Sequence, residues 1–237
     1  MHRAETLDLA LFSIMNAVRS ASLVARRLAR SSAVSRTALR AVTVRNMAAV
    51  SGGSAIAQLA SDLPHMDAVR YEHKNVKWSF KDVNFHSDSL ACGLLEQGFQ
   101  PGDVVLSWLP SHFAEQHILQ FACSKAGFVL YTLDPAQAIT DPEGAKEALA
   151  KALVITEANV LITQDAGNDV NYSRLVKEVI PEIRIFDISE GEQFISPRFP
   201  HLRFPIHTGF DNDHIGMITY KNMLVSSGET ERLLAGT

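Results

Sequence analysis

The residues best suited to chemistry in this sequence are few, and their spacing assembles no reactive group. Ser226-Ser-Gly-Glu-Thr230 has the Ser, Thr and Gly content of a loop that holds phosphate. No Lys follows it, and Glu229 would repel a phosphate, so we interpret it as a solvated turn. Asp211, Asp213 and His214 lie close together, but they lack the Gly-spaced loop and the terminal Glu of a calcium site. We therefore interpret them as a polar surface turn.

The cysteines and histidines also lack the spacing of a catalytic or metal site. Cys92 and Cys123 lie inside apolar helical patterns, which predicts two small buried thiols in a reducing compartment. His112 and His117 are separated by about 140° on a helix, so we do not expect a metal pair. The segment His207-Thr208-Gly209 is a weaker candidate for a group that faces a cleft. With no Ser-His-Asp or Cys-His arrangement at these spacings, we predict no catalytic, cofactor-binding or metal-binding residue and no cofactor.

Charge is distributed unevenly along the chain. Residues 1–55 contain eight Arg, no Lys and only two acidic residues, which is typical of a mitochondrial targeting segment. The Arg residues alternate with apolar residues at helical spacing, a pattern that also suits an anionic membrane surface. Since the whole chain carries −4 and this segment +6, residues 56–237 carry −10. Those residues show no basic stripe with interleaved aromatics, so we expect no nucleic-acid partner.

The rest of the chain alternates short apolar strands with helices, which predicts βαβ units and a parallel sheet. A flexible break at residues 51–54 precedes a hairpin at residues 68–73 and 76–80. Ser79 and Asp82 form a capping-box pattern at the start of the first helix. The expected helices are 79–97, 112–125, 143–157, 172–179 and a short one within 217–224; the expected strands are 104–109, 128–133, 160–163, 184–188 and an irregular one at 199–207, broken by Pro205.

Three turns in this pattern, taken in order, resemble a known family. They are Gly98-Phe-Gln-Pro-Gly-Asp103, Leu109-Pro-Ser111 and Leu133-Asp-Pro135, within residues 78–135. This stretch resembles the beginning of the adenylate-forming acyl-CoA synthetases, in which Asn stands where the last two turns have Ser111 and Asp134. Residues 199–224 are similar to the connector that leads into the catalytic half of the medium- and long-chain members.

The resemblance implies a partial doubly wound parallel sheet, the N-terminal subdomain of an acyl-CoA synthetase-like α/β fold. It also implies a phosphate-binding loop ending in Pro-Lys, an acid that positions Mg²⁺ and a lid lysine, all downstream of the matching segments. We find none of these motifs in residues 1–237 and so predict a non-catalytic pseudoenzyme. The expected parts are a targeting extension at residues 1–55 and a truncated synthetase-like domain at residues 56–237.

Three functions are compatible with this interpretation. The first is a structural or accessory subunit of a mitochondrial complex, such as a respiratory complex or ATP synthase, because half of a synthetase domain leaves a sheet edge for a partner to cover. The alternative is a truncated isoform or fragment of a mitochondrial fatty acyl-CoA synthetase. The third is a module that binds an acyl chain, CoA or a nucleotide without turnover. We expect the matrix or the matrix face of the inner membrane, with other protein subunits as partners and the basic leader against an anionic membrane or a partner.

Overall fold

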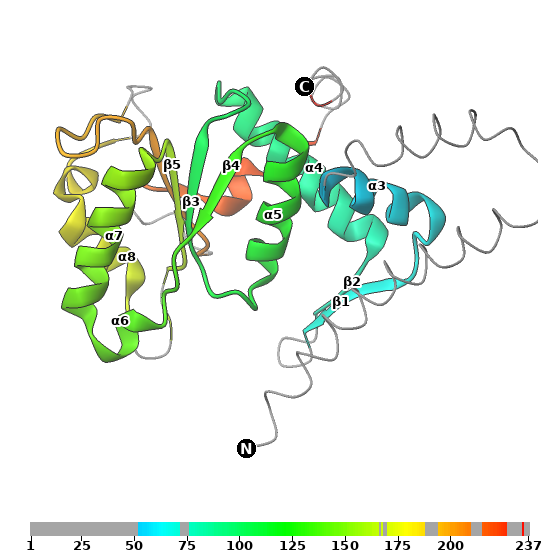
Figure 1. Cartoon of the computed structure of the whole chain (residues 1–237), viewed down its shortest axis with the longest axis horizontal. Helices are drawn as coiled ribbons and strands as arrows, with labels where there is room; N and C mark the ends of the chain where they lie inside the picture. The colour runs from blue at the N-terminus through cyan, green and yellow to red at the C-terminus, as the bar shows by residue number, and fades with distance from the viewer. Residues whose placement is uncertain are drawn as a thin grey trace, which may run out of the picture. The chain divides into compact units, whose positions relative to one another are not determined.

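A five-stranded sheet with helices on both faces forms the body of the protein (Figure 1). The computed structural model describes residues 52–71, 76–165, 167, 170–187, 194–209, 215–226 and 234, all within the compact unit Val50–Thr237. The targeting prediction for residues 1–50 lies outside the described residues. The boundary at residue 55 also stays a prediction.

All four strand pairs of this sheet are parallel, in the order β4-β3-β5-β6-β7. The strands are β3 (Val104–Trp108), β4 (Val129–Thr132), β5 (Val160–Thr163), β6 (Phe204–His207) and β7 (Ile218–Thr219). The α/β fold with a parallel sheet is therefore confirmed.

Two apolar cores, one on each face, hold the helices to the sheet. On one face lie α3 (Gly52–Asp62), α4 (Phe80–Glu96) and α5 (Ala114–Ala126); on the other lie α6 (Gln137–Thr140), α7 (Pro142–Thr156) and α8 (Tyr172–Val179) (Figure 1). Alternate residues of β3 enter opposite cores, because side chains alternate along a strand: Val105 faces the α4–α5 side, and Leu106 and Trp108 face the α7–α8 side. This two-sided burial explains why the central strands are apolar throughout.

The hairpin and the start of α4 confirm the local predictions. Strands β1 (Asp67–Tyr71) and β2 (Val76–Ser79) pair antiparallel, while the turn at residues 72–75 lies outside the described residues. Ser79 caps α4: its hydroxyl accepts from the Asp82 N–H, and the Asp82 carboxylate accepts from the Ser79 N–H. The two residues thus satisfy backbone donors that the first turn would otherwise leave unpaired.

The predicted flexible break at residues 51–54 is wrong, because α3 begins at Gly52. Gly53 is buried and its N–H donates to the Ser124 hydroxyl at 3.0 Å. A Cβ at position 53 would lie 2.5 Å from the Lys125 Cγ, so only glycine lets α3 approach α5 this closely. Gly53 therefore serves close helix packing rather than flexibility.

The predicted strand at residues 184–188 is also wrong. Pro181–Arg184 form a 3-10 helix, η2, for which the fixed backbone angle of Pro181 is suited. Its Ile183 enters the core, whereas Ile185 is 87% exposed. The apolar pattern in this segment therefore reflects one buried turn and not a strand.

The fourth parallel strand lies later, in β6, and it contains Pro205. Phe204 N and Thr208 N both donate to backbone oxygens on the β5 side, at 3.3 and 3.0 Å. By alternation the nitrogen of Pro205 lies on the β7 side, where pairing begins only at Ile206. Because no ladder bond needs an N–H from Pro205, the residue that was expected to break the strand is accommodated within it.

Two short elements also differ from the predictions. The expected helix within residues 217–224 is the strand β7 followed by the 3-10 helix η4 (Tyr220–Met223). The four-residue α6 was not predicted. Among the described helices, none combines the length and the hydropathy that a membrane span requires.

The prediction of two buried thiols is confirmed for Cys92 and Cys123. Burial raises the pKa of the Cys123 thiol to about 12, so the reactive thiolate is scarce at neutral pH. We expect neither thiol to react with a soluble disulfide reagent such as Ellman's reagent at pH 8, and both to react once denaturant unfolds the body. Absorbance of the released thiolate measures this. Rapid labelling of either cysteine in the native protein, located by mass spectrometry, would contradict the buried placement.

Candidate functional site

Four residues form a buried row across the carboxyl end of the sheet. Trp108 pairs with Thr163, Thr163 with His207, and His207 with Thr219. All four are buried. Residues in register in a parallel sheet share one face, so this row lies on the face of Trp108, which belongs to the α7–α8 core.

The chain leaves β3 and β5 in opposite directions at this end of the sheet. From β3 it enters α5 on one face, and from β5 it enters α8 on the other (Figure 1). In open α/β sheets, ligands bind outside the carboxyl ends of the strands where neighbouring connections diverge in this way. A buried hydrogen bond from Ser107 of β3 to Gln116 of α5 fixes the first connection. The topology therefore marks the residues after β3 and β5 as the candidate ligand-facing region.

The side chain of Asp165 fixes the second connection. Its Oδ1 accepts from the Ser173 hydroxyl at 2.8 Å, and its backbone oxygen accepts from the N–H groups of Tyr172 and Ser173. Lys177 lies one turn further along α8, and burial lowers its pKa while the charge of Asp165 acts in the opposite direction. These contacts set how the chain enters α8 beside the buried row.

His207 contacts Gly209, which follows β6, and Thr219 of the neighbouring strand β7. Its Nδ1 lies 3.2 Å from the Gly209 N, whose N–H donates to it, and its Nε2 lies 3.4 Å from the Thr219 hydroxyl oxygen. Asp165 lies close to His207. A Cβ placed on Gly209 would lie 2.6 Å from the Asp165 Oδ2 and 2.9 Å from the His207 Nδ1, so both side chains border the same point. His207 is completely buried, so it is not a group that faces a cleft.

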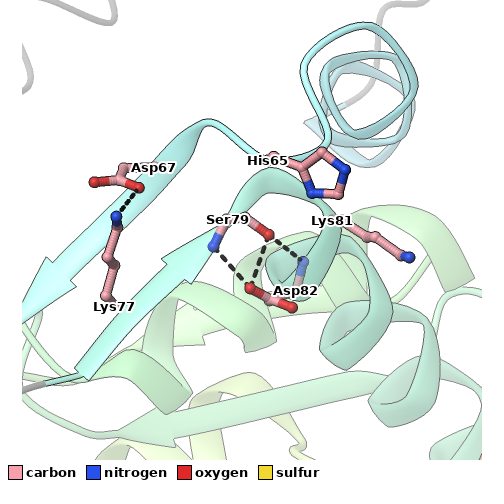
Figure 2. A pocket seen from close by; sticks show the side chains of 6 residues that line it. All are labelled: His65, Asp67, Lys77, Ser79, Lys81 and Asp82. Carbon is pink, nitrogen blue, oxygen red and sulfur yellow. Dashed lines mark hydrogen bonds and ion pairs between the residues drawn. The ribbon is translucent and has the colours of Figure 1, made fainter.

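A second candidate is the hollow of about 430 Å³ at the start of α4, lined by His65, Asp67, Lys77, Ser79, Lys81 and Asp82 (Figure 2). Lys77 pairs with Asp67 at 2.8 Å. The N–H groups at this helix start already have partners: Phe80 donates to the Met66 oxygen, and Lys81 to the Pro64 oxygen. Together with the capping box, these bonds occupy the donors that would bind a phosphate. We therefore do not assign a ligand to the hollow.

His86 lies in the second turn of α4, beside the rings of Trp78 and Phe85. Burial lowers its pKa below the ordinary value of 6.5, with Asp82 opposing. A histidine whose pKa is lower in the folded state gives stability that is complete above 6.5 and falls as the pH decreases toward the folded pKa. The free energy of unfolding should therefore decrease from pH 7.5 to pH 5.5 by more in the wild type than in His86→Gln. Equal decreases in urea titrations of both proteins would contradict this.

A third cluster joins the hairpin to the start of α5. The Tyr71 hydroxyl lies 3.0 Å from His117 Nδ1, which is 2.8 Å from the Phe113 oxygen, and the Tyr220 hydroxyl donates to the Glu115 backbone oxygen at 3.4 Å. Burial and the charge of Glu115 raise the pKa of Tyr71 to about 12, so its hydroxyl stays protonated. These contacts attach the hairpin to the body, and we assign them no chemistry.

Little of this arrangement was predicted from the sequence. Asp211, Asp213, His214 and residues 227–230 lie outside the described residues, so their interpretations stay predictions. Within the described residues, no three His, Cys, Asp or Glu side chains group so that they could hold a metal ion. The missed residues are Thr163, Asp165 and Thr219, and a polar residue at or just after the end of an apolar strand is the signal that could have found them.

Comparison with known proteins identifies relatives of this chain. A family described as AMP-binding enzyme matches residues 56–198. YngI of Bacillus subtilis (strain 168), whose name ascribes to it an acyl-CoA synthetase activity, is 30% identical over 157 residues, which cover 66% of this chain and 27% of YngI. Medium-chain acyl-CoA ligase ACSF2, mitochondrial, is 29% identical over 132 residues in Bos taurus, with 55% of this chain and 20% of the ligase covered. The same ligase of Mus musculus is 26% identical over 182 residues, with 76% and 27% covered.

Solved structures show the same fold. Acetoacetyl-CoA synthetase from Streptomyces lividans superposes with a TM-score of 0.58 at 19% identity, over 76% of this chain and 26% of that protein. The luciferase-like enzyme of Zophobas morio superposes with a TM-score of 0.56 at 14% identity, over 77% and 36%. At these identities the likeness concerns the fold alone. The match spans only 20–27% of the length of the three curated relatives named above.

These relatives correct the prediction of a pseudoenzyme. The curated ACSF2 relatives are acyl-CoA ligases, so the matching region belongs with enzymes. The prediction relied on motifs that were not found in residues 1–237. Because these residues match only about a quarter of the relatives' length, they need not contain every catalytic motif of such an enzyme.

Proposed function

This chain belongs to the AMP-binding enzyme family, and from that premise we propose that it forms the N-terminal portion of a mitochondrial fatty acyl-CoA ligase. The observation that carries the proposal is the family match over residues 56–198, which includes β1 to α8 in unbroken order. The names of the relatives favour this function over an accessory subunit, because they describe ligases. The proposed reaction joins a fatty acid to CoA through an acyl adenylate, with a medium-chain acid as the first substrate to test.

Within this ligase, the described residues would supply a scaffold and one wall of the site. The buried row of Trp108, Thr163, His207 and Thr219 fixes the carboxyl end of the sheet, and the Asp165–Ser173 bond fixes the entry to α8. A scaffold of this kind holds loops in place without reacting, which agrees with the complete burial of His207. Adenylation itself would use groups from the remainder of the ligase.

A chimera tests the proposal. Residues 1–237 are joined to the part of mouse ACSF2 that follows its matched region, and acyl-dependent exchange between pyrophosphate and ATP is measured with medium-chain acids. We expect exchange well above that of the mouse remainder alone, with the full 237-residue chain measured in parallel. The intact mouse ligase is the positive control. A chimera that melts cooperatively yet shows no exchange above the remainder alone would overturn the proposal.

The mitochondrial location is a separate part of the proposal. The Arg-rich segment of residues 1–55 and the word mitochondrial in the names of the ACSF2 relatives support it. A fluorescent reporter fused behind residues 1–55 should accumulate in mitochondria. Replacing Arg26, Arg27 and Arg30 together with Gln should weaken the accumulation. A diffuse cytosolic signal from the unchanged fusion would refute this part while leaving the ligase assignment open.

A further inference from the structure

The five most exposed large apolar side chains among the described residues lie at one end of the sheet. They are Val154 and Ile155 in the last turn of α7, Ile185 directly after η2, Ile195 and Ile215, and they are between 60% and 87% exposed. The chain enters every strand of a parallel sheet at the same end. The last turn of α7 precedes β5, Ile195 precedes β6 and Ile215 precedes β7, so these segments approach the amino end of the sheet (Figure 1). We call the five residues the aliphatic patch.

A contact between two rings brings two of the isoleucines together. Phe186 and Phe194, the neighbours of Ile185 and Ile195 in the sequence, meet edge to face with ring centroids 5.2 Å apart. Phe194 is buried in the α7–α8 core, and Phe186 packs against that core. The two rings therefore point inward, whereas the isoleucines beside them are exposed.

The other members of the patch adjoin the same segments. A Cβ on Gly216 would overlap the backbone oxygen of Ile183, so the chain just before β7 passes directly over η2. At the end of α7, the carboxylate of Glu157 lies 3.9 Å from Nε2 of His201, in the same segment as Ile195. These contacts place the patch around η2 and the end of α7.

Charged residues of both signs surround the patch. Arg184 and Asp187 flank Ile185 in the sequence, Glu157 ends α7, and Arg198 donates to a backbone oxygen at the end of α8. All four charged residues are exposed. Their charges cancel, although residues 56–237 as a whole carry −10. Two copies of the acidic body can therefore meet at this surface without adding net repulsion between them.

We propose that the aliphatic patch joins two copies of this chain in a symmetric homodimer. The patch exposes roughly 700 Å², close to the area of about 800 Å² that each partner contributes to an interface of standard size. In a two-fold interface the same surface must complement itself, and an apolar centre with both signs of charge at its margin meets that condition. The inference goes beyond the proposed function and does not depend on it.

Analytical ultracentrifugation of the full 237-residue chain tests the dimer. Over concentrations from about 1 to 200 µM the chain should change from monomer to dimer, with a dissociation constant on the order of 10 µM. A chain that stays monomeric over this range would overturn the proposal. Species that grow beyond the dimer as the concentration rises would also overturn it, because a two-fold contact closes at two copies.

Two variants connect the dimer to the patch. Ile185→Lys and Ile195→Lys each place a charge in the apolar centre and should raise the dissociation constant by on the order of 100-fold. Since both side chains are exposed, circular dichroism should show the native fold in each variant. Ile139→Lys is the matched control, because Ile139 is 57% exposed but lies on α6, which follows the carboxyl end of β4. A dimer that survives both patch variants, or that is weakened equally by the control, would overturn the proposal.

The chimera with mouse ACSF2 distinguishes a second copy from the remainder of the ligase as the occupant of the patch. The chimera should dimerise as the 237-residue chain does, and Ile185→Lys should abolish its dimer. An active chimera that stays monomeric would overturn the homodimer while the proposed function stands. A chimera that is inactive yet dimerises through the patch would support the homodimer while the proposed function fails.

Discussion

Replacing Gly93 with Ala should destabilise the protein by about 3 kcal/mol, although alanine favours a helix over glycine by roughly 1 kcal/mol. Gly93 lies in the last turn of α4, where a Cβ would overlap the backbone oxygen of Met223. A backbone atom cannot rotate away as a flexible side chain can. Either α4 or η4 must therefore move, which uncovers Tyr220 and Met223, both members of the α4–α5 core. Urea unfolding of the full chain, followed by circular dichroism, measures the difference.

Gly52→Ala is the matched control for this substitution. Gly52 also lies in a helix, but a Cβ there would be 3.5 Å from the Ser124 hydroxyl oxygen, an ordinary contact. We expect Gly52→Ala to be neutral or slightly stabilising. If both alanine variants unfold at the same urea concentration as the wild type, η4 does not pack against α4 at Gly93.

Local signals in the sequence predicted the elements that they determine. The Ser79–Asp82 capping box and Gly127, which adopts the left-handed conformation at the end of α5, depend only on residues within one turn. The helix predicted at residues 172–179 agrees with α8 to the residue, because Asn171 caps it and Ile180–Pro181 ends it. Signals of this kind act within one segment of the chain, so they can be recognised in the sequence without the rest of the fold.

Some features that depend on distant partners were not predicted. Pro205 fits in β6 only because β7 begins pairing one residue later, and no local pattern carries that information. Likewise, the sequence around Gly53 resembles a flexible link, and only the structure shows that Gly53 packs closely against Lys125 of α5. The same limit applies to the candidate site, because the row from Trp108 to Thr219 depends on the register of four strands. Sequence spacing could have suggested polar residues after strands, but not which of them meet.

Replacing Trp108 with Ala should cost about 4 kcal/mol, the largest effect that we expect from a single substitution. Trp108 is almost fully buried, it lies edge-on to Tyr172 with ring centroids 5.3 Å apart, and it belongs to the α7–α8 core. Alanine would leave a cavity between the sheet and α8 that the packed strands cannot close. It would also remove the neighbour of Thr163 in the buried row, so the carboxyl end of the sheet should loosen together with the core.

Two further variants separate the effect of this cavity from the effect on stability of losing any tryptophan. Trp108→Phe keeps a ring in the core and should cost about 1.5 kcal/mol. Trp78→Ala removes a partly buried ring from the hairpin side of the body and should cost less than Trp108→Ala. Urea unfolding of the full chain, followed by circular dichroism, ranks the three variants without depending on either indole as a probe. A cost below about 1 kcal/mol for Trp108→Ala would contradict its buried position, since truncation of an exposed side chain has an effect of that size or smaller. Because Trp108 joins the α7–α8 core to the buried row, the chimera that carries Trp108→Ala should also lose exchange activity at temperatures where Trp78→Ala retains it.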